Sequence, residues 1–180
     1  MKDDKITIDC FGKLSIKMGS REMGSEMNSE KARELIAFLM TYEGKSVKKT
    51  TVCDALWSDH DPKHSADSLY KLVDKIRDMP IPFHLECRRN IIQLHLDNVC
   101  SDLTEFTRGI RDRENIKALE SVIPLYQGTL FEEEGYEWIM DKEGKFDMLY
   151  LDALQYLMDH YSKKGSRHKL FYYEALMERF

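Results

Sequence analysis

The sequence has no long hydrophobic run and no start typical of secretion. No apolar stretch approaches the roughly 20 residues that span a bilayer. The first residues, MKDDKITID, lack the apolar core of a signal peptide. We therefore expect a soluble, cytoplasmic protein that does not contact a membrane.

Close cysteine pairs are also absent. The four cysteines lie far apart, at Cys10, Cys53, Cys87 and Cys100. None belongs to a CxxC motif, and nothing indicates an oxidising compartment. We expect four reduced and mostly buried thiols.

Catalytic and metal-binding motifs are scarce. The sequence contains no GxSxG elbow and no phosphate-binding loop, so we do not expect an enzyme. Cys53, His60 and His64 carry zinc-binding atoms, but a fourth ligand is missing and Pro62 separates the histidines. We expect no metal ion and no cofactor.

Basic charge is not in excess. The net charge is −5, and hydrophobic residues make up 42% of the chain, enough for a real core. Residues 1–100 hold 16 basic and 16 acidic side chains, whereas residues 101–180 hold 11 and 16. Any surface for nucleic acid must therefore be local, because phosphate contact requires positive charge.

The first part of the chain predicts two strands followed by a helix. Apolar and polar residues alternate over residues 6–11 and 14–18, which predicts a small antiparallel sheet. Ser29 is then a candidate cap for a helix ending near Glu43 and Gly44.

Residues 51–79 indicate a helix-turn-helix. The second helix has an apolar stripe, and the turn before it contains Pro62, which cannot continue a preceding helix. The stripe consists of Leu69, Leu72, Val73, Ile76 and Met79. The opposite face carries Asp67, Lys71, Asp74, Lys75 and Asp78. In such a unit the second helix can enter a DNA major groove.

Apolar and polar residues alternate again over residues 83–96, as they do in a strand. Apolar residues alternate with His84, Glu86, Gln93 and His95 on either side of an Arg88-Arg89-Asn90 turn. A hairpin after three helices, with arginines at its tip, is the arrangement of a winged helix.

The remaining segments have helical period. We expect an antiparallel helix pair over residues 103–126, a long helix ending at Gly165, and a last helix over residues 169–180. Its core positions are either Leu170, Tyr173 and Leu176 or Tyr172, Ala175 and Met177. The expected fold class is thus α+β and then all-α: a winged helix-turn-helix with an N-terminal antiparallel sheet, followed by a tetratricopeptide-like helical domain.

Several short motifs occur in a characteristic order. They are Phe11-Gly12, KARELIAFLM from Lys31, DALW from Asp54, Ala66 with Leu69, Val73 and Ile76-Arg77, Asp102 with Phe106, LYQG from Leu125, and Trp138. With these motifs the chain resembles the Streptomyces antibiotic regulatory proteins. That family joins an OmpR-like winged helix to a helical bacterial transcriptional activation domain.

The resemblance implies a DNA-binding transcriptional regulator, which could be the output part of a response regulator. Its domains would be a winged helix over residues 1–98 and an activation domain over residues 101–180, the latter either truncated or naturally short. Implied partners are double-stranded DNA, RNA polymerase or a receiver or sensor domain, and a second copy of the chain. The alternative is a protein-interaction module on a winged-helix scaffold that has lost DNA binding.

The expected DNA contacts are polar or basic residues on the second helix of the helix-turn-helix, on the hairpin tip and before the preceding helix. They are Lys48, Lys49, Ser68, Lys71, Lys75, Arg77, Arg88 and Arg89. The alternative interpretation is a solvated helix face, on which Asp67 and Lys71 form an i,i+4 ion pair, and a hairpin tip made soluble by arginine.

Two further features have a simple and a functional interpretation. Acidic residues 132–134 favour a solvated loop over a docking patch for a basic partner. The late aromatics favour packing between helices over a contact surface. These are Tyr150, Tyr156, Tyr161, Phe171, Tyr172 and Tyr173.

Overall fold

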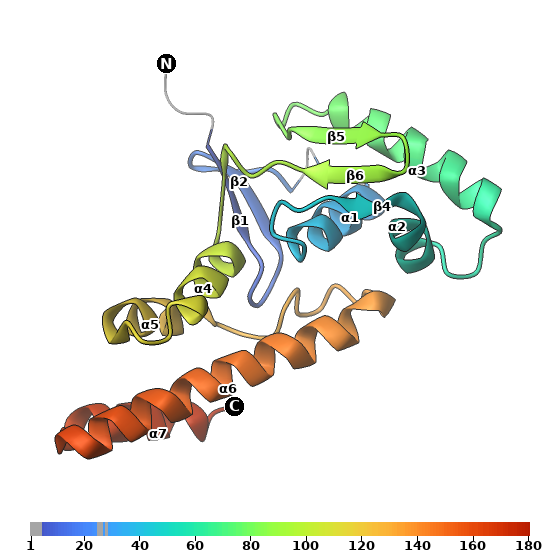
Figure 1. The fold of residues 1–180 in the computed structure, drawn as a ribbon. Helices are drawn as coiled ribbons and strands as arrows, with labels where there is room; N and C mark the ends of the chain where they lie inside the picture. The colour runs from blue at the N-terminus through green and yellow to red at the C-terminus, as the bar shows by residue number, and fades with distance from the viewer. Residues whose placement is uncertain (1–4, 25–26, 28) are drawn as a thin grey trace.

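The computed structural model describes residues 5–24, 27 and 29–180. Within them the chain is a mixed α and β protein with seven α-helices and two small sheets. Figure 1 shows the β5–β6 hairpin and α3 at one end of the molecule, and the long helix α6 with α7 at the other. None of the helices in these ranges is long and apolar enough to cross a membrane.

The first sheet has the strand order β3-β2-β1-β7. The predicted strands are β1 (Ile6–Asp9) and β2 (Ser15–Met18), which pair antiparallel, and β3 (Arg21–Glu22) extends them. The predicted antiparallel pairing is confirmed for these strands, but the sheet as a whole is mixed, because β7 (Val99–Ser101) pairs with β1 in parallel. A three-residue strand is too short to show the alternation that revealed the others.

Three helices follow, α1 (Glu30–Met40), α2 (Lys49–Leu56) and α3 (Pro62–Arg77). Ser29 occupies the N-cap position of α1, but its side chain makes no capping hydrogen bond, so that part of the prediction is wrong. Asp61 instead caps α3, because its carboxylate accepts from the backbone N–H groups of Lys63 and His64 at 3.1 Å. Pro62 is therefore the first residue of α3, where its missing N–H costs nothing.

The predicted hairpin is confirmed. Strands β5 (Leu85–Arg88) and β6 (Ile91–Leu94) pair antiparallel around an Arg89-Asn90 turn, and β4 (Val47–Lys48) joins β6 on its other edge. Leu85, Ile92 and Leu94 are buried, so the apolar face of the hairpin packs on the helices. The polar face, with His84, Glu86 and His95, points away from that core.

The helical half begins with α4 (Asp102–Arg111) and α5 (Ile116–Val122), followed by the short 3-10 helix η1 (Ile123–Leu125). A second 3-10 helix, η2 (Glu137–Ile139), leads into α6 (Met140–Lys164). As predicted, α6 ends at Gly165, whose φ of +70° is the left-handed conformation that glycine tolerates. The last helix, α7, spans Arg167–Met177.

The late aromatics divide between core and surface. Tyr150 and Tyr173 are buried, which favours the first of the two predicted core faces of α7. Tyr156, Phe171 and Tyr172 are exposed, so packing accounts for only part of the group.

The two halves share one hydrophobic core. Phe11, just after β1, contacts the rings of Phe106, Tyr126 and Phe146 at centroid distances of 5.0, 4.7 and 6.0 Å. Asp102 accepts hydrogen bonds from the backbone N–H groups of Cys10 and Phe11 at 2.8 and 2.9 Å. All four cysteines are free thiols; Cys10 and Cys53 are buried, and Cys87 and Cys100 are half-buried.

Glu120 joins α5 to the last two helices. Its Oε1 atom accepts from Lys169 Nζ at 2.7 Å, from the Tyr161 hydroxyl at 2.8 Å and from the Tyr173 hydroxyl at 2.9 Å. Burial alone would raise the pKa of Glu120, but these hydrogen bonds outweigh it, and the pKa lies below its ordinary value.

We expect opposite effects from alanine at two helical glycines. A Cβ at Gly109 would lie 2.5 Å from Val122 Cγ1, so Gly109→Ala should push α4 from α5 and cost about 1–3 kcal/mol of unfolding free energy. Gly144 in α6 has nothing within 4 Å, so Gly144→Ala should stabilise by up to about 1 kcal/mol. Urea unfolding measures both, and a Gly109→Ala variant as stable as wild type would contradict this packing.

Glu120 should give a pH-dependent contribution to stability. Because its pKa is lowered on folding, the contribution is complete above the ordinary glutamate value of 4.5 and is lost as pH falls below it. Glu120→Gln should therefore lower the unfolding free energy by about 1–2 kcal/mol at pH 7 and by much less near pH 3.5. Urea unfolding at both pH values, with Glu114→Gln as an exposed control, measures the difference. A gap that does not shrink at low pH would argue against the network.

Candidate nucleic-acid interface

Helix α3 separates its two faces as its sequence predicts. Leu69, Leu72, Val73 and Ile76 are buried, whereas Asp67, Lys71, Asp74, Lys75 and Asp78 are exposed. Met79 lies beyond the end of the helix and packs partly buried against the core. The Asp67–Lys71 ion pair of the alternative interpretation does not form among the described residues; Asp74 pairs instead with Arg77, at 3.5 Å.

Lys49 connects the three parts of this surface. Its Nζ donates to the Tyr70 hydroxyl on α3 at 3.0 Å and to the backbone carbonyl of Arg89, at the hairpin tip, at 2.7 Å. It also lies 4.5 Å from the centroid of the Tyr70 ring. Burial alone would lower the pKa of Lys49, but its contacts with Tyr70 and Cys87 raise it, so the amine stays charged.

The prediction for Lys49 needs one correction, because Lys49 is the first residue of α2 and does not precede that helix. Its amine also makes hydrogen bonds within the protein. Its backbone N–H donates to the carbonyl of Asn90 at 2.9 Å, so the turn is attached to α2 twice. Lys49 therefore braces α3 against the hairpin.

Arg77 also has a bracing role. Its guanidinium donates to the backbone carbonyl of Leu85 at 3.2 Å, which ties the end of α3 to the start of β5. Arg88 points outward, with 77% of its side chain exposed, and pairs with Glu86 at 2.9 Å. Arg89 has a φ of +42°, the left-handed conformation that the tight turn requires.

The predicted residues therefore separate into two groups. Lys48, Lys71, Lys75, Arg88 and Arg89 are exposed, and Ser68 is half-buried beside them. Lys49, which is half-buried, and Arg77, whose side chain is still 46% exposed, hold the framework on which the others are presented. The exposed group comes from three elements that are separate in sequence, and the brace at Lys49 was not predictable from spacing.

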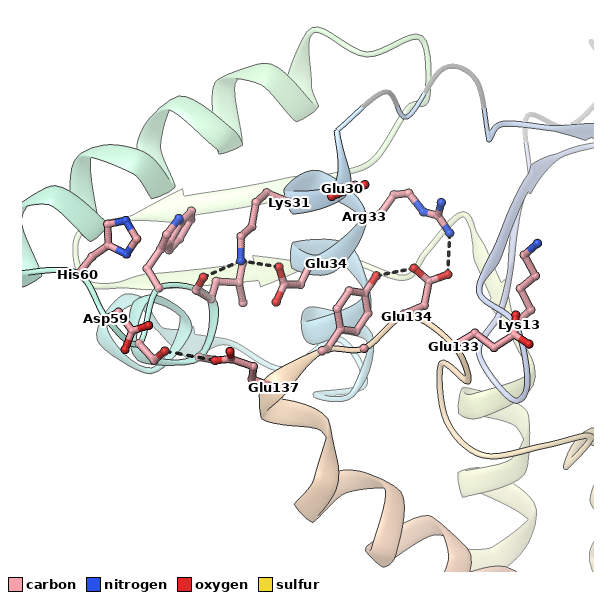
Figure 2. Close-up of a pocket in the computed structure, with 16 residues that line it drawn as sticks. Lys13, Glu30, Lys31, Arg33, Glu34, Asp59, His60, Glu133, Glu134 and Glu137 are labelled. Atoms are coloured by element: carbon pink, nitrogen blue, oxygen red, sulfur yellow. Dashed lines mark hydrogen bonds and ion pairs between the residues drawn. The ribbon is translucent and has the colours of Figure 1, made fainter.

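A cleft of about 670 Å³ lies elsewhere, between α1, the end of α2 and the loop before η2. Figure 2 shows its charged lining. The acidic residues are Glu30, Glu34, Asp59, Glu133, Glu134 and Glu137, against Lys13, Lys31 and Arg33.

Most of the basic charge in this cleft is already paired. Lys31 contacts Glu34 at 2.7 Å, and Arg33 contacts Glu134 at 2.8 Å (Figure 2). The expectation that residues 132–134 form a merely solvated loop is wrong for Glu134, whose side chain is 17% exposed. Exposed carboxylates of Glu30, Asp59 and Glu133 remain, so the cleft is acidic.

The structure points to other candidate metal ligands than the sequence did. Cys53 is buried, and the rings of His60 and His64 stack with centroids 5.3 Å apart. Neither histidine belongs to a cluster of three or more possible ligands among the described residues. Sequence reasoning missed His84, His95 and Asp97, whose ligand atoms lie within 4.8 Å of one another. The alternation of apolar and polar residues could have indicated the two histidines, because it places both on the polar face of the hairpin.

No protein-family model matches the sequence, and the curated proteins contain no significant match.

The brace at Lys49 yields a testable comparison with its neighbour Lys48. Lys49→Ala should lower the unfolding free energy by about 0.5–1 kcal/mol, because a cation–π contact and two hydrogen bonds are lost. It should also speed amide hydrogen exchange at the hairpin turn. Lys48→Ala, at an exposed side chain, should change stability by less than about 0.5 kcal/mol. Equal effects of the two substitutions on exchange would refute the brace.

Proposed function

We propose that the protein is a DNA-binding transcriptional regulator, as the resemblance to the Streptomyces antibiotic regulatory proteins implies. In this proposal α1, α2, α3 and the β5–β6 hairpin form a winged helix-turn-helix over residues 1–98. Helix α3 enters the major groove, and the hairpin is the wing that contacts the adjacent backbone.

The observation that carries the proposal is the bridge made by Lys49. One amine donates hydrogen bonds both to the hydroxyl of Tyr70 on α3 and to the carbonyl of Arg89 at the hairpin tip. The outward face of α3 and the hairpin tip therefore lie side by side. Exposed positive charge is then available from Lys48, Lys71, Lys75, Arg88 and Arg89. Basic side chains on a helix and an adjoining tip can contact phosphates on both sides of one groove.

The acidic residues of α3 suit selective rather than general binding. Asp67, Asp74 and Asp78 share its exposed face with Lys71 and Lys75, so the face carries little net charge. A carboxylate in the groove can accept a hydrogen bond from the amino group of cytosine, and it repels phosphate elsewhere. We therefore expect weak affinity for random DNA and a marked preference for particular sites.

In the same proposal, residues 101–180 form the activation domain, a tetratricopeptide-like arrangement that contacts other cytoplasmic proteins. Its helices pack as two successive pairs, α4 with α5 and α6 with α7. RNA polymerase, a receiver or sensor domain and a second copy of the chain are the expected partners. Phe171 and Tyr172, exposed on α7, offer apolar contact area for one of them.

A second candidate function is a protein-interaction module that does not bind DNA. The acidic cleft beside α1 favours it, because Glu30, Asp59 and Glu133 would attract a basic partner. Selection from random duplex DNA with the intact protein separates the two. Enrichment of a common sequence supports the regulator, and failure to enrich any sequence at low salt supports the module.

Binding to a selected duplex should weaken as salt rises. Five exposed basic side chains would lower the logarithm of affinity by about 0.9 for each phosphate they neutralise, per tenfold increase in salt. Fluorescence anisotropy over a salt series measures this slope. A flat salt dependence would be incompatible with phosphate contact.

Two double substitutions should act in opposite directions on DNA binding. Asp67→Asn with Asp74→Asn removes negative charge from the outward face of α3 and should strengthen non-specific binding by about 1 kcal/mol or less per site. Arg88→Ala with Arg89→Ala should weaken binding to all duplexes alike. Circular dichroism checks folding. If both variants fold and neither changes affinity for any duplex, α3 and the hairpin do not read DNA.

A further inference from the structure

Two histidines and an aspartate meet at the base of the β5–β6 hairpin. Single ligand atoms of His84, His95 and Asp97 all lie within 4.8 Å of one another. Among the described residues, this is the one group of three or more potential metal ligands that comes so close. His84 precedes β5, and His95 and Asp97 follow β6, so the group joins the two ends of the hairpin.

The register of the hairpin fixes the histidine pair. Leu85 pairs with Leu94, so His84 and His95 continue the ladder directly opposite each other. The backbone N–H of His95 donates to the carbonyl of His84 at 2.9 Å. Opposed side chains share one face, and the two imidazole rings stack with centroids 4.2 Å apart. Their proximity therefore follows from backbone pairing rather than from chance orientation.

Glu86 orients one of these rings. It lies on the same face of β5 as His84, and its Oε2 atom is 3.1 Å from Nε2 of His95. When the Nε2–H of His95 donates to that carboxylate, Nδ1 carries the lone pair that a metal ion requires. A carboxylate that holds a ligand histidine in this way is a common outer partner in metal sites.

We propose that His84, His95 and Asp97 bind a divalent transition-metal ion of the zinc class, with Glu86 as the orienting partner of His95. Two imidazoles and one carboxylate form a donor set for zinc or a neighbouring first-row metal, with a position left for water. Magnesium and calcium prefer oxygen ligands throughout, so the two nitrogens select against them. His84 and Asp97 are exposed, so an ion can enter directly from solvent.

The bound ion would close the base of the hairpin. Because Glu86 also pairs with Arg88 through its other oxygen, at 2.9 Å, the site connects through one carboxylate to the hairpin tip. The proposal stands whether or not the hairpin contacts DNA, because its ligands are separate from the exposed basic residues.

Titration of the untagged, chelator-treated full chain tests this site. Zinc should bind with one-to-one stoichiometry by calorimetry, and cobalt should give visible absorption bands that zinc displaces. His84→Ala and Asp97→Asn should each weaken zinc binding at least about tenfold, and Glu86→Gln should weaken it about 10- to 100-fold. Zinc should raise the melting temperature of wild type but not that of His84→Ala.

The second stacked histidine pair provides a matched control. A variant with His60→Ala and His64→Ala removes two imidazoles from another exposed surface, one more than His84→Ala removes, and should keep wild-type zinc affinity. Far-ultraviolet circular dichroism establishes that each variant folds. The proposal is overturned if wild type shows neither heat nor cobalt absorption at millimolar metal. It is also overturned if Asp97→Asn binds as wild type does, or if the control loses as much affinity as His84→Ala.

Discussion

The hydrogen bonds from the end of β1 to Asp102 are the interaction on which the rest of the structure depends. The carboxylate accepts the backbone N–H groups of Cys10 and Phe11 at the point where β7 passes into α4. Burial raises the pKa of Asp102, and three backbone hydrogen bonds oppose that shift by stabilising its charged form. Once β1 is held there, the ring of Phe11 enters the core formed by Phe106, Tyr126 and Phe146.

Other contacts cross between the halves from this point. The backbone N–H of Gly12 donates to the carbonyl of Thr129, and that of Phe131 donates to the carbonyl of Cys10, so the loop before η2 lies against β1. Farther along, Trp138 donates to Glu34 of α1 at 3.1 Å, and Glu134 pairs with Arg33. The helical half is therefore fastened to the sheet and to α1, and the opposite side, with α3 and the hairpin, stays open.

The basic residues of the open side serve two purposes. Lys49 and Arg77 are used within the protein, the first between α3 and the hairpin turn and the second between α3 and β5. Their neighbours remain exposed and are interspersed with Asp67 and Asp74. In the proposed DNA-binding role, a surface with near-balanced charge gains little from general attraction to phosphate, so selectivity would come from the positions of individual side chains. The braces fix those positions.

The sequence by itself determined the local elements with a clear period. The stripe of α3, the alternation around Arg88-Arg89-Asn90 and the glycine stop at Gly165 were all predictable, because periodic burial and turn chemistry are written in neighbouring residues. Only the tertiary structure decided the rest. The parallel strand β7 and the occupation of Lys49 depend on contacts between segments far apart in the chain. The alternation of the hairpin places His84 and His95 on one face, but the pairing register decides that they lie opposite each other. The spacing of neighbouring residues does not predict such contacts, because the tertiary fold decides which distant segments meet.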